Sequence, residues 1–432
     1  MQGQCEPILR KRRLNVKGLL WRPLGLVVKA HYNDSTRVVL HRGDYGVNIP
    51  RRHTGMSGIK KQGPWYKIPQ LLNALRYYLT PKDDEVLEYD PFQLRVFSNR
   101  QYVKYGEKFY IESLKQDKNL GRRLSTNDMD IDAFKYVLAQ VPAVRTVDFV
   151  GRGEPLLNPD IFEMIDTVAE YNQAYTSLTT TGMLLDKHGD DLLDSGLNQL
   201  VVRCYGHRPS AFHAMSGLEA LNFPEIEKNL RHFVKKWKSR KSTLEVVLQM
   251  TVDVHSFRDI PDMLTFAQKM GVNALWVDNY LSPSGDEASE RSLYDDYEPV
   301  KEFLAEVMGN FAADARATGS DFNLKLPVLL SRDMSESRNC SDPYTVLSVD
   351  GDCTVLPCSR QMIYQMPGNI LADFKEELLD PDKAGKIWDE DFWNNPMYQW
   401  MRQVHTPPEA VLGENPYPVP NPCQHCPKNV GN

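Results

Sequence analysis

The chain has 432 residues, 41% hydrophobic and 25% charged, which is typical of a globular protein with a sizeable core. It contains no run of 18 apolar residues and no apolar segment near its start, so we expect neither a membrane span nor a secretory signal. Seven cysteines, an odd number, favour a reducing, cytoplasmic location over a disulfide framework.

Charge is distributed unevenly along the chain. Residues 1–80 carry 15 Lys and Arg against 3 Asp and Glu, a net charge of +12. The rest of the chain carries a net charge of −18. A basic arm of this kind suits contact with nucleic acid, or it lies as a solvated extension on the acidic body of its own chain. Residues 1–90 are therefore taken as a basic N-terminal extension, in which runs at 24–28 and 38–40 predict a hairpin.

Apolar runs alternate with amphipathic helices from about residue 93 onwards. Strands are predicted at 144–150, 174–179, 199–203, 244–251 and 273–279. Helices are predicted from Asn158-Pro159, and at 185–195, 223–238, 259–270 and 297–317. This order predicts repeated βαβ units, and therefore an α/β fold with a parallel sheet that is open or closed into a barrel.

Five of the seven cysteines fall between 340 and 426, where the helical periodicity weakens. Cys423 and Cys426 form a Cys-x2-Cys knuckle, and Cys340 with Cys358 is the natural second pair. Four thiolates hold either zinc or an iron–sulfur cluster, which spacing alone does not distinguish. The alternative is a set of buried thiols that act as small hydrophobic side chains, which suits Cys353.

Several segments resemble those of the radical S-adenosylmethionine enzyme family. The motifs are VGRGEPLLNP at 150–159, TTTGMLL at 179–185 and LVVRCYG at 200–206. The tail resembles the SPASM extension of that family, through 348–351, 356–358, 368–370, 387–388 and the cysteine knuckle. The resemblance covers about residues 93–432. It implies a partial (β/α) barrel over 91–320 and a SPASM-like iron–sulfur module over 321–432.

The chain departs from the family at the motif that binds the catalytic cluster. The family uses Cys-x3-Cys-x2-Cys after the first strand, but this chain places Gln101, Tyr105 and Lys108 there. No cysteine occurs between Cys5 and Cys204, and a cluster of this kind needs thiolate ligands. The resemblance therefore implies a degenerate form that lacks the catalytic cluster.

The S-adenosylmethionine pocket of the family is matched in part. Arg152 replaces the first glycine of the Gly-Gly-Glu-Pro segment, and Arg203 stands at a position where the family often has serine. By resemblance, the candidate cofactor-binding residues are Gly151, Gly153, Glu154, Pro155 and Thr181. Two interpretations remain open: this segment retains a ligand, or it only shapes a strand-to-helix turn.

The C-terminal tail matches the family more closely, at the cysteines that bind the cluster of its SPASM extension. Cys340, Cys358, Cys423 and Cys426 resemble the four ligands of its single-cluster extension. That resemblance favours one [4Fe–4S] cluster, with zinc as the alternative.

Three functions follow from these observations. The first is a binding, scaffolding or partner protein, acting beside a protein partner or an active enzyme. The second is an enzyme that binds S-adenosylmethionine or another nucleotide for non-radical chemistry, with Glu154, Tyr105 and Lys108 as groups to test. The third is an assembly protein that binds nucleic acid through residues 1–80. No membrane partner is expected.

Overall fold

The computed structural model describes a defined part of the chain. These residues are 31–32, 38–39, 68–80, 86–98, 128–150, 154–171, 173–216, 222–281, 290–332, 337–351, 353, 355–356, 358, 393–394, 396–406, 419, 421–424, 426 and 428. The chain divides into two compact units, Met1–Lys61 and Gln62–Asn432.

The first unit contains one described pair of short strands. Strand β1 (His31–Tyr32) pairs antiparallel with β2 (Val38–Val39). The run predicted at 38–40 therefore contains strand β2, and its partner is β1. The run at 24–28 lies outside the described residues.

The second unit is built on a nine-stranded sheet in the order β11-β10-β3-β4-β5-β6-β7-β8-β9. Eight of these strands run parallel, and only β11 pairs antiparallel, with β10. The strands are β3 (Gln93–Phe97), β4 (Thr146–Val150), β5 (Tyr175–Thr180), β6 (Gln199–Arg203), β7 (Glu245–Val252), β8 (Ala274–Asn279), β9 (Asn323–Lys325), β10 (Val346–Val349) and β11 (Val355–Leu356). The predicted α/β fold with a parallel sheet is confirmed.

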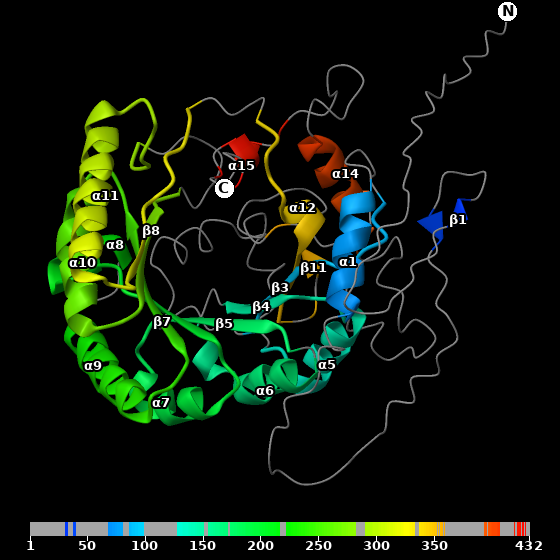
Figure 1. Ribbon diagram of the computed structural model, residues 1–432, viewed down its shortest axis with the longest axis horizontal. Helices are drawn as coiled ribbons and strands as arrows, with labels where there is room; N and C mark the ends of the chain where they lie inside the picture. Colours follow the sequence, from blue (N-terminus) through cyan, green and yellow to red (C-terminus); the bar gives the residue numbers. More distant parts are fainter. Residues whose placement is uncertain are drawn as a thin grey trace, which may run out of the picture. The chain divides into compact units, whose positions relative to one another are not determined.

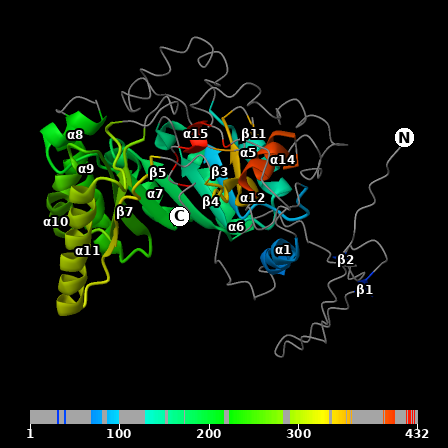
Figure 2. The ribbon, with the colours of Figure 1, turned by 90° about the horizontal axis from the view of Figure 1, so that it is seen from above.

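Helices cover the outer side of the curved sheet (Figure 1). They are α5 (Ile131–Gln140), α6 (Ile161–Tyr171), α7 (Leu185–Asp194), α8 (Pro209–Ser216), α9 (Asn222–Arg240), α10 (Ile260–Met270) and α11 (Glu298–Thr318), with α1 (Ile68–Leu79) before the sheet. The short helices α12 (Asp342–Thr345), α14 (Pro396–His405) and α15 (Asn421–Gln424) follow it. Figure 2 shows α12, α14 and β11 grouped beside β3.

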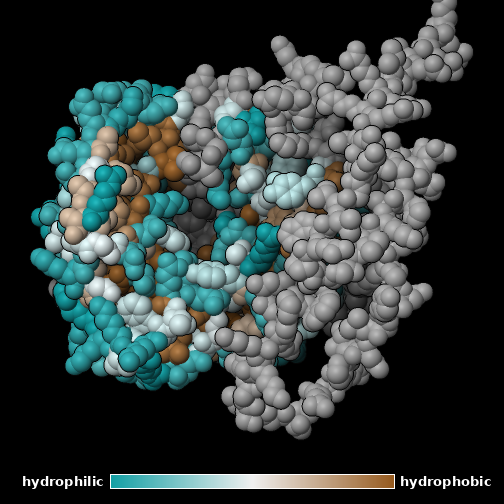
Figure 3. Space-filling view, in the orientation of Figure 1, coloured by the Kyte–Doolittle hydropathy of each residue, from teal (hydrophilic) through white to brown (hydrophobic). Residues whose placement is uncertain are grey.

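Alternation along each strand separates the two faces of the sheet. In β4, Val147 and Phe149 are fully buried towards the helices, and the Phe149 ring lies 5.6 Å from that of Phe134 on α5. Their neighbour Asp148 points to the inner face. Because side chains alternate with a period of two, the inner face receives every second residue of each strand. On the outside of the molecule the rim of helices is mostly hydrophilic, with hydrophobic residues visible on its inner side (Figure 3).

Most predicted boundaries lie within one or two residues of the observed ones. Helix α10 ends at Gly271, whose φ of 80° is left-handed and favours glycine, as the sequence predicted. The helix expected from Asn158-Pro159 starts two residues later than predicted, since α6 begins at Ile161. A 3₁₀ turn, η2 (Pro155–Leu157), occupies the preceding residues.

The last part of the chain contributes to the same sheet. Strand β10 pairs parallel with β3, Val346 opposite Gln93 and Val349 opposite Val96. The fully buried Tyr398 of α14 donates to the Val346 carbonyl at 3.2 Å. The boundary at residue 320 stays a prediction, and three strands from beyond it, β9, β10 and β11, belong to the same sheet.

Candidate functional site

The carboxyl ends of parallel strands meet at one edge of a sheet, where ligands usually bind in such folds. Three regions of the second unit bring polar or thiol side chains together near this edge. These are the turn after β4, the network after β7 and β8, and the cysteines next to β10.

Glu154 organises the turn after β4. Its side chain is fully buried and accepts three hydrogen bonds, from the Thr181 amide at 2.8 Å, the Thr181 hydroxyl at 2.6 Å and the Leu156 amide at 3.2 Å. Thr181 directly follows β5, so this carboxylate ties the ends of two neighbouring strands together. Glu154 and Thr181, both predicted to bind a cofactor, therefore bond to each other. This geometry favours the architectural interpretation of their side chains.

The structure describes Pro155 but neither of the two predicted glycines of this segment. Pro155 is buried and begins η2, where its fixed φ suits a tight turn. Gly151 and Gly153 lie outside the described residues. Backbone contacts from these two glycines to a ligand stay a prediction.

Asn158, which follows the same turn, bonds to two other segments of the chain. Its amide nitrogen donates to the Ser98 carbonyl at 2.7 Å and to the Met129 carbonyl at 2.9 Å. Ser98 follows β3, and Met129 precedes α5. Asn158 thus holds together the two ends of the segment in which the family carries its cluster motif. Gln101, Tyr105 and Lys108 lie within that segment, outside the described residues.

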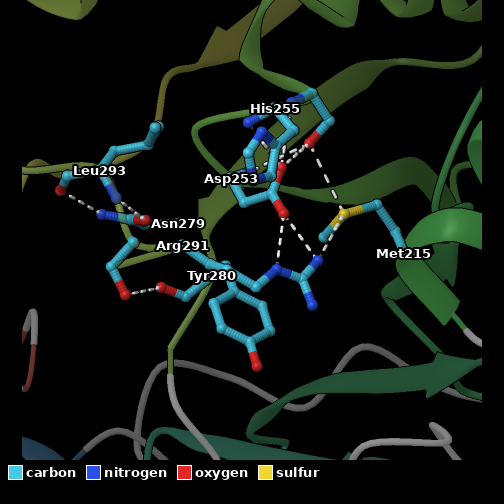
Figure 4. A network of polar contacts seen from close by, with 9 residues as sticks. Met215, Asp253, His255, Asn279, Tyr280, Arg291 and Leu293 are labelled. Carbon is cyan, nitrogen blue, oxygen red and sulfur yellow. Dashed lines mark hydrogen bonds and ion pairs between the residues drawn. The ribbon is translucent and has the colours of Figure 1, made fainter. Parts of the chain in front are cut away.

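A second polar network follows β7 and β8 (Figure 4). Asp253, directly after β7, accepts two hydrogen bonds from the Arg291 guanidinium, at 2.8 and 2.6 Å. Its other oxygen accepts the Ser256 hydroxyl at 2.7 Å. Burial favours the protonated carboxyl, but the Ser256 and Arg291 bonds prevail and lower the pKa of Asp253 below its ordinary value. The Arg291 guanidinium also lies 4.4 Å from the centre of the Tyr280 ring.

This network forms one wall of a cavity of about 450 Å³. Arg208, Tyr205 and His255 contribute polar groups to it, and Met215 and Met250 contribute apolar surface. The size suits a small-molecule ligand. The sequence carries no motif for this cavity, because its lining comes from helix α8 and the segment before it, from β7 and the turn after it, and from Arg291.

Charged side chains also line the inner face of the sheet. Arg95 of β3 lies 4.0 Å from Asp148 of β4, which also accepts a hydrogen bond from Gln93. Burial raises the pKa of Asp148, and Arg95, Gln93 and Lys428 oppose that shift. On β6 and β7, Gln199 donates to Glu245 at 2.8 Å. The polar alternation within the strands was the only sequence signal for this surface.

The four predicted metal ligands belong to one region of the fold. Cys423 and Cys426 are buried, and the Cys426 amide donates to the Cys423 carbonyl at 3.3 Å. Burial raises the pKa of the Cys340 thiol well above its ordinary value, and Asp342, Cys358 and Cys426 raise it further. Three of the four cysteines therefore lie within electrostatic reach of one another.

Within the described residues, no three His, Cys, Asp or Glu side chains are already arranged to hold a metal ion. None of the six described cysteines forms a disulfide.

The surroundings of the cysteines fit a negatively charged metal–thiolate centre. Arg338, two residues before Cys340 in the sequence, is buried, and Lys428, two residues after Cys426, lies 3.3 Å from Asp342. Positive charge inside a protein is costly unless negative charge lies nearby. The donor set and this charge fit a four-thiolate centre.

The remaining described cysteines match the alternative of buried thiols. Burial raises the pKa of Cys204 to about 12, and its sulfur donates to the Gly206 carbonyl at 3.3 Å. Cys353 is 1% exposed and has a φ of 68°.

Comparisons with known proteins agree with the fold. No protein-family model matches the chain. A probable GTP 3',8-cyclase of Methanocaldococcus jannaschii is 26% identical over 164 residues, 38% of this chain and 51% of the relative. A tungsten-containing aldehyde ferredoxin oxidoreductase cofactor-modifying protein of Pyrococcus furiosus is 23% identical over 299 residues, 64% of this chain and 76% of the relative. The chain thus spans about half the length of the first relative and three quarters of the second.

Among solved structures, Streptococcus suis SuiB bound to S-adenosylmethionine has a similar fold. The TM-score is 0.53 at 16% identity, over 83% of this chain and 75% of SuiB. SuiB bound to its precursor peptide SuiA gives a TM-score of 0.50, also at 16% identity, over 80% and 76% of the two chains. At this identity the likeness shows a shared fold.

The sheet, its helices and these relatives define the fold of the radical S-adenosylmethionine enzymes. They confirm the resemblance of this chain to that family, including its members with a C-terminal SPASM domain. No described helix is both long and apolar enough to span a membrane.

Proposed function

We propose that the chain is a radical S-adenosylmethionine/SPASM-like protein without the catalytic cluster, and that it holds one auxiliary iron–sulfur cluster. Its role is then to bind, scaffold or accompany a protein partner or an active enzyme. Cys340, Cys358, Cys423 and Cys426 would hold the cluster, which would carry single electrons.

One observation carries the first half of this proposal. The chain has no cysteine between Cys5 and Cys204, although the catalytic motif of the family follows the first strand, β3. Cys204 is buried beside β6, and its raised pKa keeps its thiol protonated. The residues present therefore do not supply three thiolates for a catalytic cluster.

The second half rests on the cysteines beside β10. Three of them act electrostatically on one another, and the buried Arg338 lies two residues before Cys340 in the sequence. The same environment suits zinc, since both centres are anionic when bound by four thiolates. Resemblance to the SPASM extension favours iron and sulfide.

Metal analysis of the full chain, purified without oxygen, tests the proposal. We expect about four irons and four sulfides per chain, as one [4Fe–4S] cluster requires. Changing Cys423→Ser together with Cys426→Ser removes them. Cys353→Ser is the matched control, because it alters a buried thiol outside the predicted ligand set and leaves the iron in place.

Other metal contents would refute different parts of the proposal. About eight irons would refute the loss of the catalytic cluster, because a second cluster would need further ligands. Zinc without iron would refute the iron–sulfur assignment and make the site structural.

A second candidate function is an enzyme that binds S-adenosylmethionine or another nucleotide for non-radical chemistry. The cavity beside Asp253 and Arg291 favours it, because it combines charge with aromatic and apolar surface at the carboxyl edge of the sheet. Addition of S-adenosylmethionine should then raise the unfolding temperature. An unchanged temperature at millimolar ligand would argue against this function.

Partner and location are proposed from sequence. The charge of +12 on residues 1–80 suits nucleic acid. Salt-dependent retention on nucleic acid, lost on deletion of residues 1–61, would support that contact; retention unchanged by the deletion would refute it. A cytoplasmic location is proposed from the odd number of cysteines.

A further inference from the structure

The cavity of about 450 Å³ extends to the helix side of the sheet. Strand pairing places Glu245 of β7 in the same row as Asp148 of β4, which points to the inner face. Because side chains alternate along a strand, Met250, five residues after Glu245, points to the opposite face, which the helices cover. The cavity that Met250 lines therefore lies between β7 and α8, outside the inner face of the sheet.

This position separates the cavity from the segment after β4. The structure describes three of the predicted cofactor-binding residues, Glu154, Pro155 and Thr181, and none of them lines the cavity. None of the four predicted cysteine ligands lines it either. The cavity is thus a site that the resemblance in sequence does not account for.

The charges in the inner wall of the cavity cancel each other. The Asp253 carboxylate accepts five hydrogen bonds, two from the Arg291 guanidinium and three from the Ser256 hydroxyl and the amides of His255 and Ser256. A carboxylate offers about four lone-pair sites, so Asp253 is saturated. Arg291 spends Nε and Nη2 on Asp253, and Nη2 also lies 3.7 Å from the Met215 sulfur (Figure 4).

A second pair of opposite charges lines the cavity where its side chains are exposed. Arg208 directly precedes α8, and Asp259 ends the 3₁₀ turn η3 (Phe257–Asp259). Their atoms Nη2 and Oδ1 are 3.8 Å apart, beyond hydrogen-bond distance, and the side chains are 58% and 26% exposed. Within the described part of the chain, neither side chain has a second partner. Such an exposed pair contributes little to stability, so a ligand can engage both charges.

The floor of the cavity is apolar. Tyr205, Met215 and Met250 line it and are all buried. Methionine side chains adapt their shape to a neighbour, and their sulfurs make favourable contacts with aromatic rings. The floor therefore suits a bulky apolar group, an aromatic ring above all.

We propose that this cavity binds a free α-amino acid with a bulky apolar side chain. Its carboxylate would pair with Arg208, its ammonium group with Asp259, and its side chain would contact the two methionines of the floor. An α-amino acid carries both charges on one carbon, which matches two opposite charges that lie close together. A simple carboxylate would be repelled by Asp259, and a simple amine by Arg208. The inference goes beyond the proposed function, since it needs neither an iron–sulfur cluster nor S-adenosylmethionine.

Titration calorimetry of the full wild-type chain at pH 7 tests this ligand class with four probes. L-Phenylalanine carries all three features. Hydrocinnamate lacks the ammonium group, phenethylamine lacks the carboxylate, and glycine lacks the apolar side chain. We expect saturable binding of L-phenylalanine, and binding weaker by about tenfold or more for each of the other three. This comparison does not depend on the folding of a variant.

Two variants assign the charges. Arg208→Gln and Asp259→Asn should each weaken L-phenylalanine binding by about tenfold. Because each removes one like charge, Asp259→Asn should bind hydrocinnamate more tightly than the wild type, and Arg208→Gln should bind phenethylamine more tightly. Arg258→Gln is the matched control, since Arg258 is an exposed arginine of the same turn that lies over the Phe257 ring and does not line the cavity. It should leave every affinity unchanged.

Three results would overturn the inference. The first is no saturable binding of L-phenylalanine at millimolar concentration. The second is an L-phenylalanine affinity that neither Arg208→Gln nor Asp259→Asn changes. The third is hydrocinnamate binding to the wild type as tightly as L-phenylalanine, because the ammonium group would then contribute nothing. None of these results bears on the iron content, so the proposed function stands or falls separately.

Discussion

Truncation of Glu154 tests whether the Gly-x-Gly-Glu-Pro segment is architectural. In Glu154→Ala the Thr181 and Leu156 amides lose their acceptor while they remain buried. Each unsatisfied donor costs about 1–3 kcal/mol, and the truncated side chain leaves a small cavity. We expect a loss of about 3–5 kcal/mol in the free energy of unfolding.

Glu154→Gln should lie between the wild type and the alanine variant. It keeps one carbonyl acceptor but turns an NH₂ group towards the donors that the carboxylate served. About 1–3 kcal/mol of lost stability follows. Glu163→Ala is the control, since Glu163 pairs with Lys135 at 2.7 Å on an exposed surface where an ion pair contributes about 0–1 kcal/mol.

Urea denaturation, followed by far-ultraviolet circular dichroism at pH 7, measures these differences. Stability of Glu154→Ala equal to that of the control variant would refute the architectural interpretation. In that case the carboxylate would be free to serve a ligand.

Three further outcomes are expected. Burial raises the pKa of Asp90 to about 6, so the folded state retains a proton that the unfolded state loses, and stability falls by up to about 3 kcal/mol as pH rises from about 4 to 6. Asp90→Asn still accepts from the Ala143 amide and should abolish that dependence. Asp253→Ala removes the partner of the half-buried Arg291 and should cost about 1–3 kcal/mol. Arg402→Leu removes the donor of the buried Pro343 and Trp393 carbonyls, whereas Asn394 Oδ1 keeps the Leu87 amide, and should cost about 2–4 kcal/mol.

A different result would contradict each of these three predictions. An unchanged pH slope in Asp90→Asn, measured by urea unfolding across pH 4–7, would assign the slope to another group. An unchanged urea midpoint in Asp253→Ala would mean that solvent replaces the ion pair. A stabilised Arg402→Leu would show that desolvation of the guanidinium outweighs its hydrogen bonds.

The sequence predicted much of the barrel because its signals are local. Alternation and helical periodicity located the strands from β4 to β8, and Gly271 marked the end of α10. The start of α6 was predicted two residues too early, because Asn158 ends the 3₁₀ turn η2 instead of capping the helix. Strand β9 and helix α8 were missed, because three and eight residues carry little periodicity.

Of the candidate sites too, only those with a local pattern could be predicted. The Cys-x2-Cys knuckle could be found in the sequence because its two cysteines lie three residues apart. The Asp253–Arg291 pair carries no sequence signal, since its two residues lie far apart along the chain.

The sequence by itself determined the fold class, the charge of the N-terminal extension and the absence of cysteines from the segment after β3. These are properties of composition, order and local period. Only the tertiary structure decided that Glu154 and Thr181 bond to each other, that β10 joins the barrel sheet at β3, and that the ring nitrogens of the buried His405 have no hydrogen-bond partner. Each of these depends on which distant residues burial brings together, and a hydrogen bond forms or fails only once that packing is set.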